Sequence, residues 1–256
     1  MPDNIIAVNH LKNYLGGHWV HEDVNFSVNR GELIAIIGGS GCGKTTLLRS
    51  LLRLMRPTAG DVSVFGVDVI HASQKKLLSV QKRWGVMFQS GALFSSLTVL
   101  ENVMYVLHEY ASLSYRSQLA LAKIKIAMSG LDADAAYKYP SELSGGMKKR
   151  AALARAIALD PELIFLDEPT AGLDPKSAGD LDDLILEMRK NLGLTFVMVT
   201  HDLDTLWYVP DRVLFLGEGR VLANQPMSEL YQNPYPAIRT YFSGHRAKRS
   251  ENGRAS

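Results

Sequence analysis

The stretch LIAIIGGSGCGKTT, residues 33–46, decides the fold of this chain. An apolar run is followed by a glycine-rich turn, and helical periodicity then covers 46–55. An apolar strand that passes through glycines into a helix is the pattern of a phosphate-binding loop. The loop and the first residues of the helix comprise Gly38, Gly39, Ser40, Gly41, Cys42, Gly43, Lys44, Thr45 and Thr46. The stretch therefore predicts a strand, a loop and a helix at the centre of an α/β fold.

The residue types of this loop suit the binding of a nucleotide's phosphates. Glycines allow the backbone to curl until successive N–H groups face one anion, and the following helix adds the positive end of its dipole. Lys44 is expected to contact the β and γ phosphates, and Thr45 to ligate Mg²⁺. The alternative is a glycine-rich turn that binds nothing, but its position between a strand and a helix disfavours that interpretation.

The composition indicates an ordinary globular protein. The chain has 256 residues, of which 46% are hydrophobic and 21% charged, so it can form a sizeable core. Its net charge of +2 gives no reason to expect nucleic acid or an anionic membrane surface as a partner. Because Cys42 is the one cysteine, no internal disulfide can form, which fits the cytosol. We expect neither a signal peptide nor a membrane span, because no apolar run is long enough.

Short apolar runs alternate with longer helical patterns, which predicts an α/β fold built on a mostly parallel sheet. The predicted central strands cover 32–37, 85–88, 163–166, 195–200 and 212–216. Their nearly continuous apolar content is typical of strands covered on both faces, and ligands are expected at their carboxyl ends. Two more alternating segments, 5–28 and 60–69, predict short strands of an antiparallel flank.

An inserted helical subdomain is predicted at about 90–160. No comparable strand appears there, and helical periodicity covers 98–110, 116–129 and 146–158. The α/β pattern returns at Pro161. We therefore expect one domain over 1–244, followed by a short basic tail, 245–256, which its composition predicts to be disordered.

A second motif ends the strand at 163–166 with two acids, Asp167 and Glu168. Adjacent side chains of a strand point to opposite faces, so the two carboxylates should have different roles. Asp167 is expected to hold Mg²⁺ through water, and Glu168 to orient and deprotonate the attacking water as general base. Alone, such a pair is more often a solvated strand end, but a phosphate loop upstream favours the catalytic interpretation.

A third motif, Leu143-Ser144-Gly145-Gly146-Met147, precedes the helix predicted at 146–158. It could be a helix N-cap, since serine and glycine are suited to that position. Capping does not explain the doubled glycine, whereas exposed N–H groups and a helix dipole also form an anion site. Two such sites far apart in one chain favour a dimer in which each site meets the partner's.

With these motifs the chain resembles the nucleotide-binding subunits of ABC transporters from about residue 5 to 243. The resemblance implies a P-loop, RecA-like ATPase domain that uses ATP and Mg²⁺ and works as a homodimer. It identifies Ser144, Gly145 and Gly146 as the signature motif, which binds the γ phosphate of ATP held by the opposite subunit. Met147 stands where the family usually has glutamine, which leaves the contacts of the backbone amides unaffected.

The same resemblance gives roles to single residues. Tyr14 takes the place of the aromatic that stacks on adenine, with a packing role as the alternative and Trp19 as a rival. Gln89 matches the loop glutamine that reaches Mg²⁺ and the attacking water and that joins the two lobes. His201 matches the switch histidine that contacts the γ phosphate, and Asp174 matches the loop that crosses the dimer interface.

Two stretches, 88–94 and 141–156, are similar to the ATPase of MCE-type (Mla-like) lipid transporters. That similarity implies a subunit on the cytoplasmic face of the inner membrane that powers phospholipid transport. Its partners would be an integral-membrane permease, a periplasmic MCE-type lipid-binding protein and, as an open question, a small regulatory subunit. The transport direction is also left open.

Two other functions are compatible with the same motifs. An importer ATPase for a polar nutrient such as an amino acid shares every catalytic motif and differs in the permease it serves. A soluble ABC ATPase acting on DNA or ribosomes usually carries a coiled-coil insertion or tandem cassettes, and neither is visible in this sequence.

The permease contact is expected around 94–102, beside Gln89. Apolar residues are more frequent there than an isolated loop would expose. The alternative, of equal weight, is that Leu93, Phe94 and Leu97 cap the protein's own core.

Overall fold

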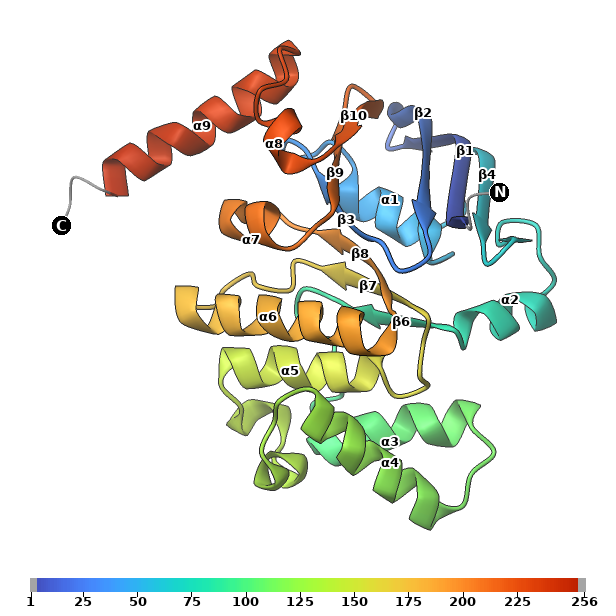
Figure 1. Ribbon diagram of the computed structural model, residues 1–256. Coiled ribbons are helices and arrows are strands. Elements are labelled where there is room, and N and C mark those ends of the chain that lie inside the picture. The colour runs from blue at the N-terminus through green and yellow to red at the C-terminus, as the bar shows by residue number, and fades with distance from the viewer. Residues whose placement is uncertain (1–3, 253–256) are drawn as a thin grey trace.

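The computed structural model describes the backbone of residues 4–252 and the side chains of residues 4–244 (Figure 1). Parallel strands form the centre of its sheet in the spatial order β9, β3, β8, β7, β6. Their bounds are β3 (Leu33–Ile37), β6 (Trp84–Met87), β7 (Leu163–Asp167), β8 (Thr195–Val199) and β9 (Arg212–Gly217). The five strands predicted from the apolar runs are thus confirmed within one or two residues.

An antiparallel flank continues the sheet on the side of β9. β1 (Asn4–Leu15) and β2 (His18–Asn29) form a long hairpin, and β4 (Ala59–Val64) and β5 (Val67–Asp68) extend it. The hairpin strands are longer than the predicted short strands, because pairing continues through several shifts of register. β10 (Arg220–Gln225), which the sequence analysis did not predict, pairs with β9 and joins β2 through Arg220 and Asp23.

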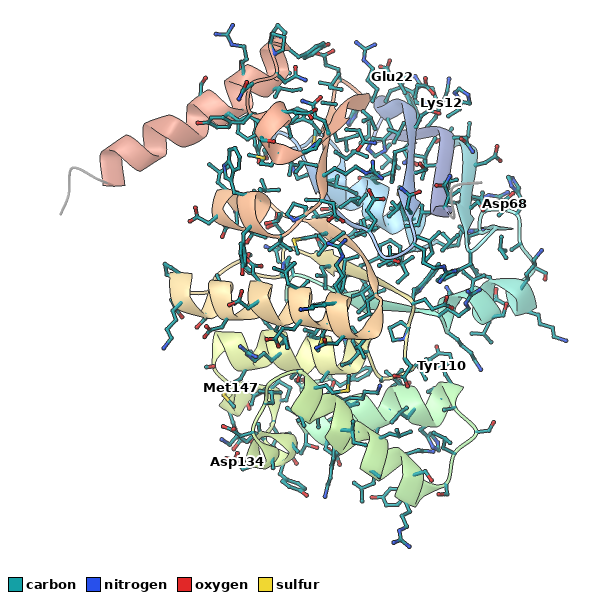
Figure 2. The ribbon with its side chains drawn as sticks, viewed as in Figure 1. Lys12, Glu22, Asp68, Tyr110, Asp134 and Met147 are labelled. Atoms are coloured by element: carbon teal, nitrogen blue, oxygen red, sulfur yellow. The ribbon has the colours of Figure 1, made fainter. Side chains whose placement is uncertain are left out.

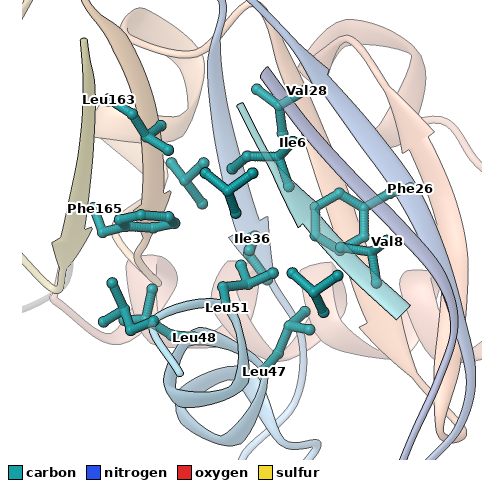
Figure 3. Packing of buried hydrophobic residues seen from close by; sticks show 14 of the residues in the cluster. Ile6, Val8, Phe26, Val28, Ile36, Leu47, Leu48, Leu51, Leu163 and Phe165 are labelled. Atoms are coloured by element: carbon teal, nitrogen blue, oxygen red, sulfur yellow. The ribbon is translucent and has the colours of Figure 1, made fainter. Parts of the chain in front are cut away.

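The main core lies between the hairpin and the central sheet, and α1 (Lys44–Leu51) fills it (Figure 3). Leucines of α1 meet apolar side chains from the antiparallel flank and from the central strands, and α2 (Gln74–Gln81), which was also not predicted, adds Val80. The residues that meet are Leu47, Leu48 and Leu51 of α1, Ile6, Val8 and Phe26 of the hairpin, and Ile36 and Phe165 of the central strands. Packing on both sides fixes α1, and with it the loop that enters the helix.

The opposite face of the central sheet is covered by α5 (Gly145–Ala156) and α6 (Pro175–Leu192). Along β7, Leu163 and Phe165 face α1, whereas Ile164 and Leu166 pack beneath α5 and α6. By this alternation Asp167 is directed to the α1 side of the sheet.

The helical lobe consists of α3 (Val99–Tyr110), α4 (Tyr115–Met128), two 3-10 turns, η1 (Ala133–Tyr137) and η2 (Pro140–Glu142), and α5. Thr98 and Glu101 form a capping box that fixes the start of α3. α5 belongs to two cores at once: Ala152 and Leu153 pack on the sheet, and Ala151 packs within the lobe. This helix therefore joins the lobe to the central sheet.

The C-terminal part returns to the sheet through α7 (Leu203–Tyr208), α8 (Met227–Leu230) and α9 (Pro236–Asn252). Ile238 and Phe242 of α9 pack with Ile37 at the end of β3, and Figure 1 shows the rest of this helix extending beyond the sheet. The tail predicted to be disordered from 245 is instead helical to Asn252, and residues 253–256 lie outside the described part. Within the described chain, no helix combines the length and the apolar character needed to cross a membrane.

Candidate functional site

The glycine-rich loop follows β3 and depends on two close backbone approaches. A Cβ atom built on Gly38 would lie 2.1 Å from the carbonyl oxygen of Leu216, and one built on Gly43 would lie 2.4 Å from Nε2 of His21. Gly41 and Gly43 also have positive φ angles, 78° and 98°, which residues with a Cβ rarely adopt. Gly38 likewise has a positive φ of 152°, so glycine is required at both close approaches by space and by backbone conformation.

A buried network of hydrogen bonds lies beside the loop, between the hairpin and α1. The Asn13 amide donates from Nδ2 to Nδ1 of His21 (2.9 Å) and to Oγ of Ser50 (3.1 Å), and Ser50 donates to the Thr46 carbonyl. Burial lowers the pKa of His21 to about 4, so its ring is neutral near pH 7. Because its Nδ1 accepts the amide proton, the ring proton resides on Nε2, beside Gly43. The network links the β1–β2 hairpin to the first turns of α1.

Lys44 is the first residue of α1 and lines a cavity of about 460 Å³. Its Nζ donates to the carbonyls of Gly38 (2.8 Å) and Gly39 (3.1 Å). The N-cap of the helix is Gly43, which has no side chain to accept from the first free amides of α1. The lining residues are Gly38, Gly39, Ser40, Lys44, Glu168, His201, Tyr241 and Gly244.

Other predicted loop residues lie near this cavity but do not line it. Cys42 turns its thiol inward against Gly38 and the core, and burial raises the pKa of that thiol. Thr45 is exposed in the first turn of α1, and Thr46 accepts the bond from Ser50. These residues thus differ in their contacts, although the motif places them in one run, and Thr46 acts through its backbone carbonyl.

Asp167 and Glu168 end β7 beside the loop. Burial, followed by the neighbouring Glu168, raises the pKa of Asp167, while Arg49 of α1 and Lys149 oppose that rise. Glu168 has a φ of 49°, an uncommon backbone conformation for a residue with a side chain. Its N–H donates to the Val199 carbonyl (2.8 Å), which ties this turn to β8.

His201 follows β8 at the same edge of the sheet. Its Nδ1 lies 2.8 Å from the Glu168 carboxylate, so the two side chains are in hydrogen-bond contact although 33 residues separate them in the sequence. The Glu168 side chain is 12% exposed, whereas that of His201 is 62% exposed. Six of the predicted residues thus line one cavity: three from the loop, Gly38, Gly39 and Ser40, together with Lys44, Glu168 and His201.

Gln89 lies just beyond β6, with an exposed side chain. β6 pairs with β7 through Met87 and Leu166, so Gln89 and Glu168 follow their strands at matching positions. The Gln89 carbonyl accepts from Nζ of Lys149 (2.7 Å), and the same ammonium donates to the Glu168 carbonyl (2.8 Å). Lys149 was not among the predicted site residues.

The predicted signature residues are not at this cavity. Ser144 is the N-cap of α5 and accepts from the Met147 amide (3.2 Å), as the capping alternative predicts. Ser144 and Gly146 line a second cavity of about 270 Å³ that also includes Arg150, and Figure 2 shows Met147 at this end of α5. Within the described chain, this cavity shares no lining residue with the one at Lys44.

Asp174 lies beside the signature segment. It caps α6 by accepting from the amide (3.0 Å) and the hydroxyl (2.6 Å) of Ser177, and these bonds lower its pKa. Leu173, from the same loop, approaches Gly145. The structure therefore groups Asp174 with Ser144 to Gly146 and apart from Lys44.

Tyr14 and its rival Trp19 form one aromatic pair at the end of the β1–β2 hairpin. Their ring centroids are 5.0 Å apart, and each side chain is 47% exposed. The Tyr14 hydroxyl donates to the Gly17 carbonyl (2.8 Å). Trp19 precedes Val20 and His21, both of which approach Gly43, so the pair stands near the loop.

Sequence reasoning missed the residues that reach the site from distant elements. Tyr241 and Gly244 of α9 line the cavity at Lys44, and burial raises the pKa of Tyr241 to about 12. No local pattern of α9 indicates this position. Lys149 could have been noticed, because it shares a helix face with the apolar Ala152 and Leu153, where a cation needs buried partners.

Comparisons with known proteins identify relatives of this chain. The family described as "ABC transporter" matches residues 21–171. The intermembrane phospholipid transport system ATP-binding protein MlaF of Escherichia coli K12 is 38% identical over 94% of this chain and 89% of its own length. The "Probable ribonucleotide transport ATP-binding protein mkl" of Mycobacterium tuberculosis H37Rv is 36% identical over 94% of this chain and 67% of its own.

Two solved structures extend the similarity to the whole fold. The first is a dimeric ATP-binding cassette in a post-hydrolysis state bound to ADP and Pi. It matches with a TM-score of 0.79 and 29% identity over 87% of this chain and 98% of that one. CbiO1 from Clostridium perfringens, part of an ABC transporter complex, matches with a TM-score of 0.81 and 31% identity over 90% and 92%.

The close approach at Gly43 predicts a difference between two alanine substitutions. Gly43→Ala should lower the free energy of unfolding by about 1–3 kcal/mol through the clash with His21, in addition to strain from the positive φ. Gly41→Ala has open space around its Cβ and should lose only the strain, about 1–2 kcal/mol. Urea denaturation of the two variants measures the difference. Equal losses would contradict the role given to the contact with His21.

Proposed function

The chain belongs to the ABC transporter family, and we propose that it is the ATP-hydrolysing subunit of a phospholipid transporter, acting through a separate membrane permease. It is an ATPase, as its family membership and its ABC ATPase relatives establish. The observation that carries the residue-level proposal is the meeting of Lys44, Glu168 and His201 around one cavity. The roles of the single residues are part of the proposal.

The loop and its cavity fit the phosphates of ATP. Gly38 and Gly43 keep the loop curled, and the uncapped N-terminus of α1 offers free amides to an anion. The Lys44 ammonium donates to the carbonyls of Gly38 and Gly39 in this structure. It lines the same cavity, where it would bind the β and γ phosphates. The pair of Tyr14 and Trp19 offers aromatic faces for adenine, and we assign the stacking on adenine to Tyr14.

The oxygen ligands near Lys44 fit Mg²⁺. We assign Thr45, Asp167 and the Gln89 side chain to the ion, because hydroxyl, carboxylate and amide oxygens suit this hard cation. Few protein ligands are needed, since Mg²⁺ keeps waters and binds substrate phosphates. When bound, the ion neutralises charge on the phosphate oxygens. Asp61, Asp68 and His71 also cluster, but they are exposed and belong to the antiparallel flank.

Hydrolysis in this proposal uses Glu168 as the general base. Its carboxylate takes a proton from water as the water oxygen bonds to the γ phosphorus, and the bond to the β-phosphate oxygen breaks. His201 holds that carboxylate through Nδ1 and leaves Nε2 for the γ phosphate. Gln89 contacts the attacking water from the end of β6 and links the helical lobe to the site.

The division of the anion-binding segments between two cavities supports a homodimer. Ser144, Gly145 and Gly146 lie at a cavity of their own, beside Asp174, so one chain presents two half-sites. In the proposed dimer these residues bind the γ phosphate held by Lys44 of the other subunit, and Asp174 lies at the interface. The dimeric state of a solved cassette with the same fold is in agreement.

The substrate class rests on the relatives. MlaF is named for phospholipid transport and is 38% identical over most of both chains, which supports phospholipid as the cargo. We place the subunit peripherally on the cytoplasmic face of the inner membrane, with an MCE-type periplasmic protein as partner and a small regulatory subunit as a further one. The name of mkl supports a second candidate, the transport of a polar solute such as a ribonucleotide.

A groove of about 410 Å³ between α3 and α4 suits the permease contact. Tyr105 and Tyr115 line it and are 45% and 72% exposed. Phe94, 46% exposed, contacts Tyr105 in a tilted arrangement, with ring centroids 5.0 Å and ring planes 60° apart. Leu93, in contrast, packs into the lobe and sheet cores, as the own-core alternative predicts. Buried Asn102 donates to the carbonyls of the loop at 94–98, which fixes the groove edge near Gln89.

Glu168→Gln tests the catalytic assignment. The variant should bind ATP with wild-type affinity, hydrolyse it at least about a hundredfold more slowly, and accumulate as a dimer with ATP and Mg²⁺. Single-turnover assays and light scattering measure these effects. Lys44→Ala is the contrasting variant, because it should weaken ATP binding by roughly tenfold or more. Near-normal turnover of Glu168→Gln would refute the general-base role.

Phe94→Ala and Tyr105→Ala test the groove. Each should weaken association with the permease by about tenfold, because exposed aromatics of this kind anchor interfaces. Tyr137→Ala is the control, since Tyr137 is a 60% exposed tyrosine of the same lobe outside the groove. Hydrogen exchange should also show protection of residues 91–104 on permease binding. Absence of protection, with unchanged association, would place the contact elsewhere.

Purification of the tagged subunit from its native membrane tests the cargo. A permease, an MCE-type protein and bound phospholipid should co-purify and be identified by mass spectrometry. A soluble solute-binding protein in place of the MCE-type protein would favour the polar-solute candidate. Ribosomes or DNA without a permease would refute transport.

A further inference from the structure

Lys149 is a cation buried within α5, with 7% of its surface exposed. Its Nζ donates to two backbone carbonyls, at 2.7 Å to Gln89 and at 2.8 Å to Glu168. These carbonyls follow β6 and β7, so the ammonium bridges the ends of neighbouring strands. Burial lowers the pKa of Lys149, and the nearby Glu168 and Asp167 oppose that shift.

The Glu168 peptide held by Lys149 is in a strained conformation. With a φ of 49°, Glu168 lies in the left-handed region, which is strained for a residue with a side chain and persists only where neighbours hold it. Its N–H is held by the Val199 carbonyl, and its carbonyl accepts from Lys149 and from the Ala171 amide (3.3 Å). Lys149 is thus the side chain that fixes the carbonyl side of this turn.

The segment after Gln89 is held by the same helix. Arg155 of α5 donates to the carbonyls of Gly91 (2.8 Å) and Ala92 (2.6 Å), and Ala92 is likewise left-handed with a φ of 48°. α5 therefore holds residues 89–92 through two cations, and one of these also reaches Glu168. Since α5 packs in both the lobe and the sheet core, its displacement would move both backbone segments together.

We propose that Lys149 is a positioning residue for hydrolysis, which fixes the backbones of Glu168 and Gln89 as one unit and transmits the position of the helical lobe to the general base. The inference rests on the role proposed above for Glu168. Lys149 itself contacts neither ATP nor water in this scheme. Its effect is to keep the Glu168 carboxylate directed at His201 when the lobe moves.

Lys149→Met tests this role, because methionine keeps the length and apolar contacts of the side chain but donates no hydrogen bond. We expect kcat to fall by about tenfold or more while the Kd for ATP changes by less than about twofold. Lys149→Arg can donate to both carbonyls and should recover most of the lost rate. Lys148→Met, one residue earlier on the same helix and less buried, is the matched control and should match the wild type.

Hydrogen exchange without nucleotide gives a readout independent of hydrolysis. In Lys149→Met the amides of Gly91 and Ala171, which bond to Phe88 and Glu168 within the two held turns, should exchange faster than in Lys148→Met. If the wild type hydrolysed no ATP, the proposed function would fail, yet this comparison would still test the bridge.

Three results would overturn the proposal: an unchanged kcat in Lys149→Met, a parallel loss of kcat and ATP affinity, or unchanged exchange at both amides. If Lys149→Met does not fold, Lys149→Gln takes its place, since its neutral amide can donate to one carbonyl. That variant should show an intermediate kcat with normal ATP affinity, and a wild-type kcat would refute the bridge.

Discussion

The backbone of the phosphate loop passes so close to its neighbours at Gly38 and Gly43 that no side chain fits at either position. At Gly38 the neighbour is the Leu216 carbonyl of β9, and at Gly43 it is His21 of β2. The loop is thereby held between the parallel sheet and the antiparallel flank. α1 continues from it into the main core, where leucines anchor the helix on both sides (Figure 3). The direction of the first amides of α1, and hence of the cavity, depends on these contacts.

Asp167, the last residue of β7, and Glu168, which follows it, have different surroundings because the chain leaves the strand between them. Asp167 follows Leu163 and Phe165 toward α1, where Arg49 lies, whereas Glu168 turns out of the strand and meets His201. The turn at Glu168 is strained and is held by Val199 on one side and by Lys149 on the other. Strain that neighbours maintain in this way is typical of functional sites.

α5 connects the regions that the chain keeps apart. Its N-terminus carries Ser144 at the second cavity, its apolar faces enter both the lobe core and the sheet core, and its cations hold the backbone near Gln89 and Glu168. A displacement of the lobe would therefore be transmitted through α5 to the backbone at Gln89 and Glu168. Rigid elements of this kind are the physical means by which separated sites are coupled.

The sequence by itself determined the features whose chemistry lies within one run of residues. Local patterns predicted three such features: the strand, glycine loop and helix at 33–46, the two acids at the end of β7, and the cap of α5. Backbone geometry and local alternation suffice to define each of them. The family resemblance added His201, Gln89, Asp174 and Tyr14, which have weak signals of their own.

Only the tertiary structure decided which distant residues support that site. The contacts of His21 with Gly43, of Lys149 with two strand ends and of Tyr241 with the cavity join segments from 19 to about 200 residues apart. Their positions depend on the strand order, which places β6 beside β7, on the hairpin that brings His21 to the loop, and on the return of the chain through α9. β10 was missed for the same reason, since its pairing with β9 outweighs weak local preference.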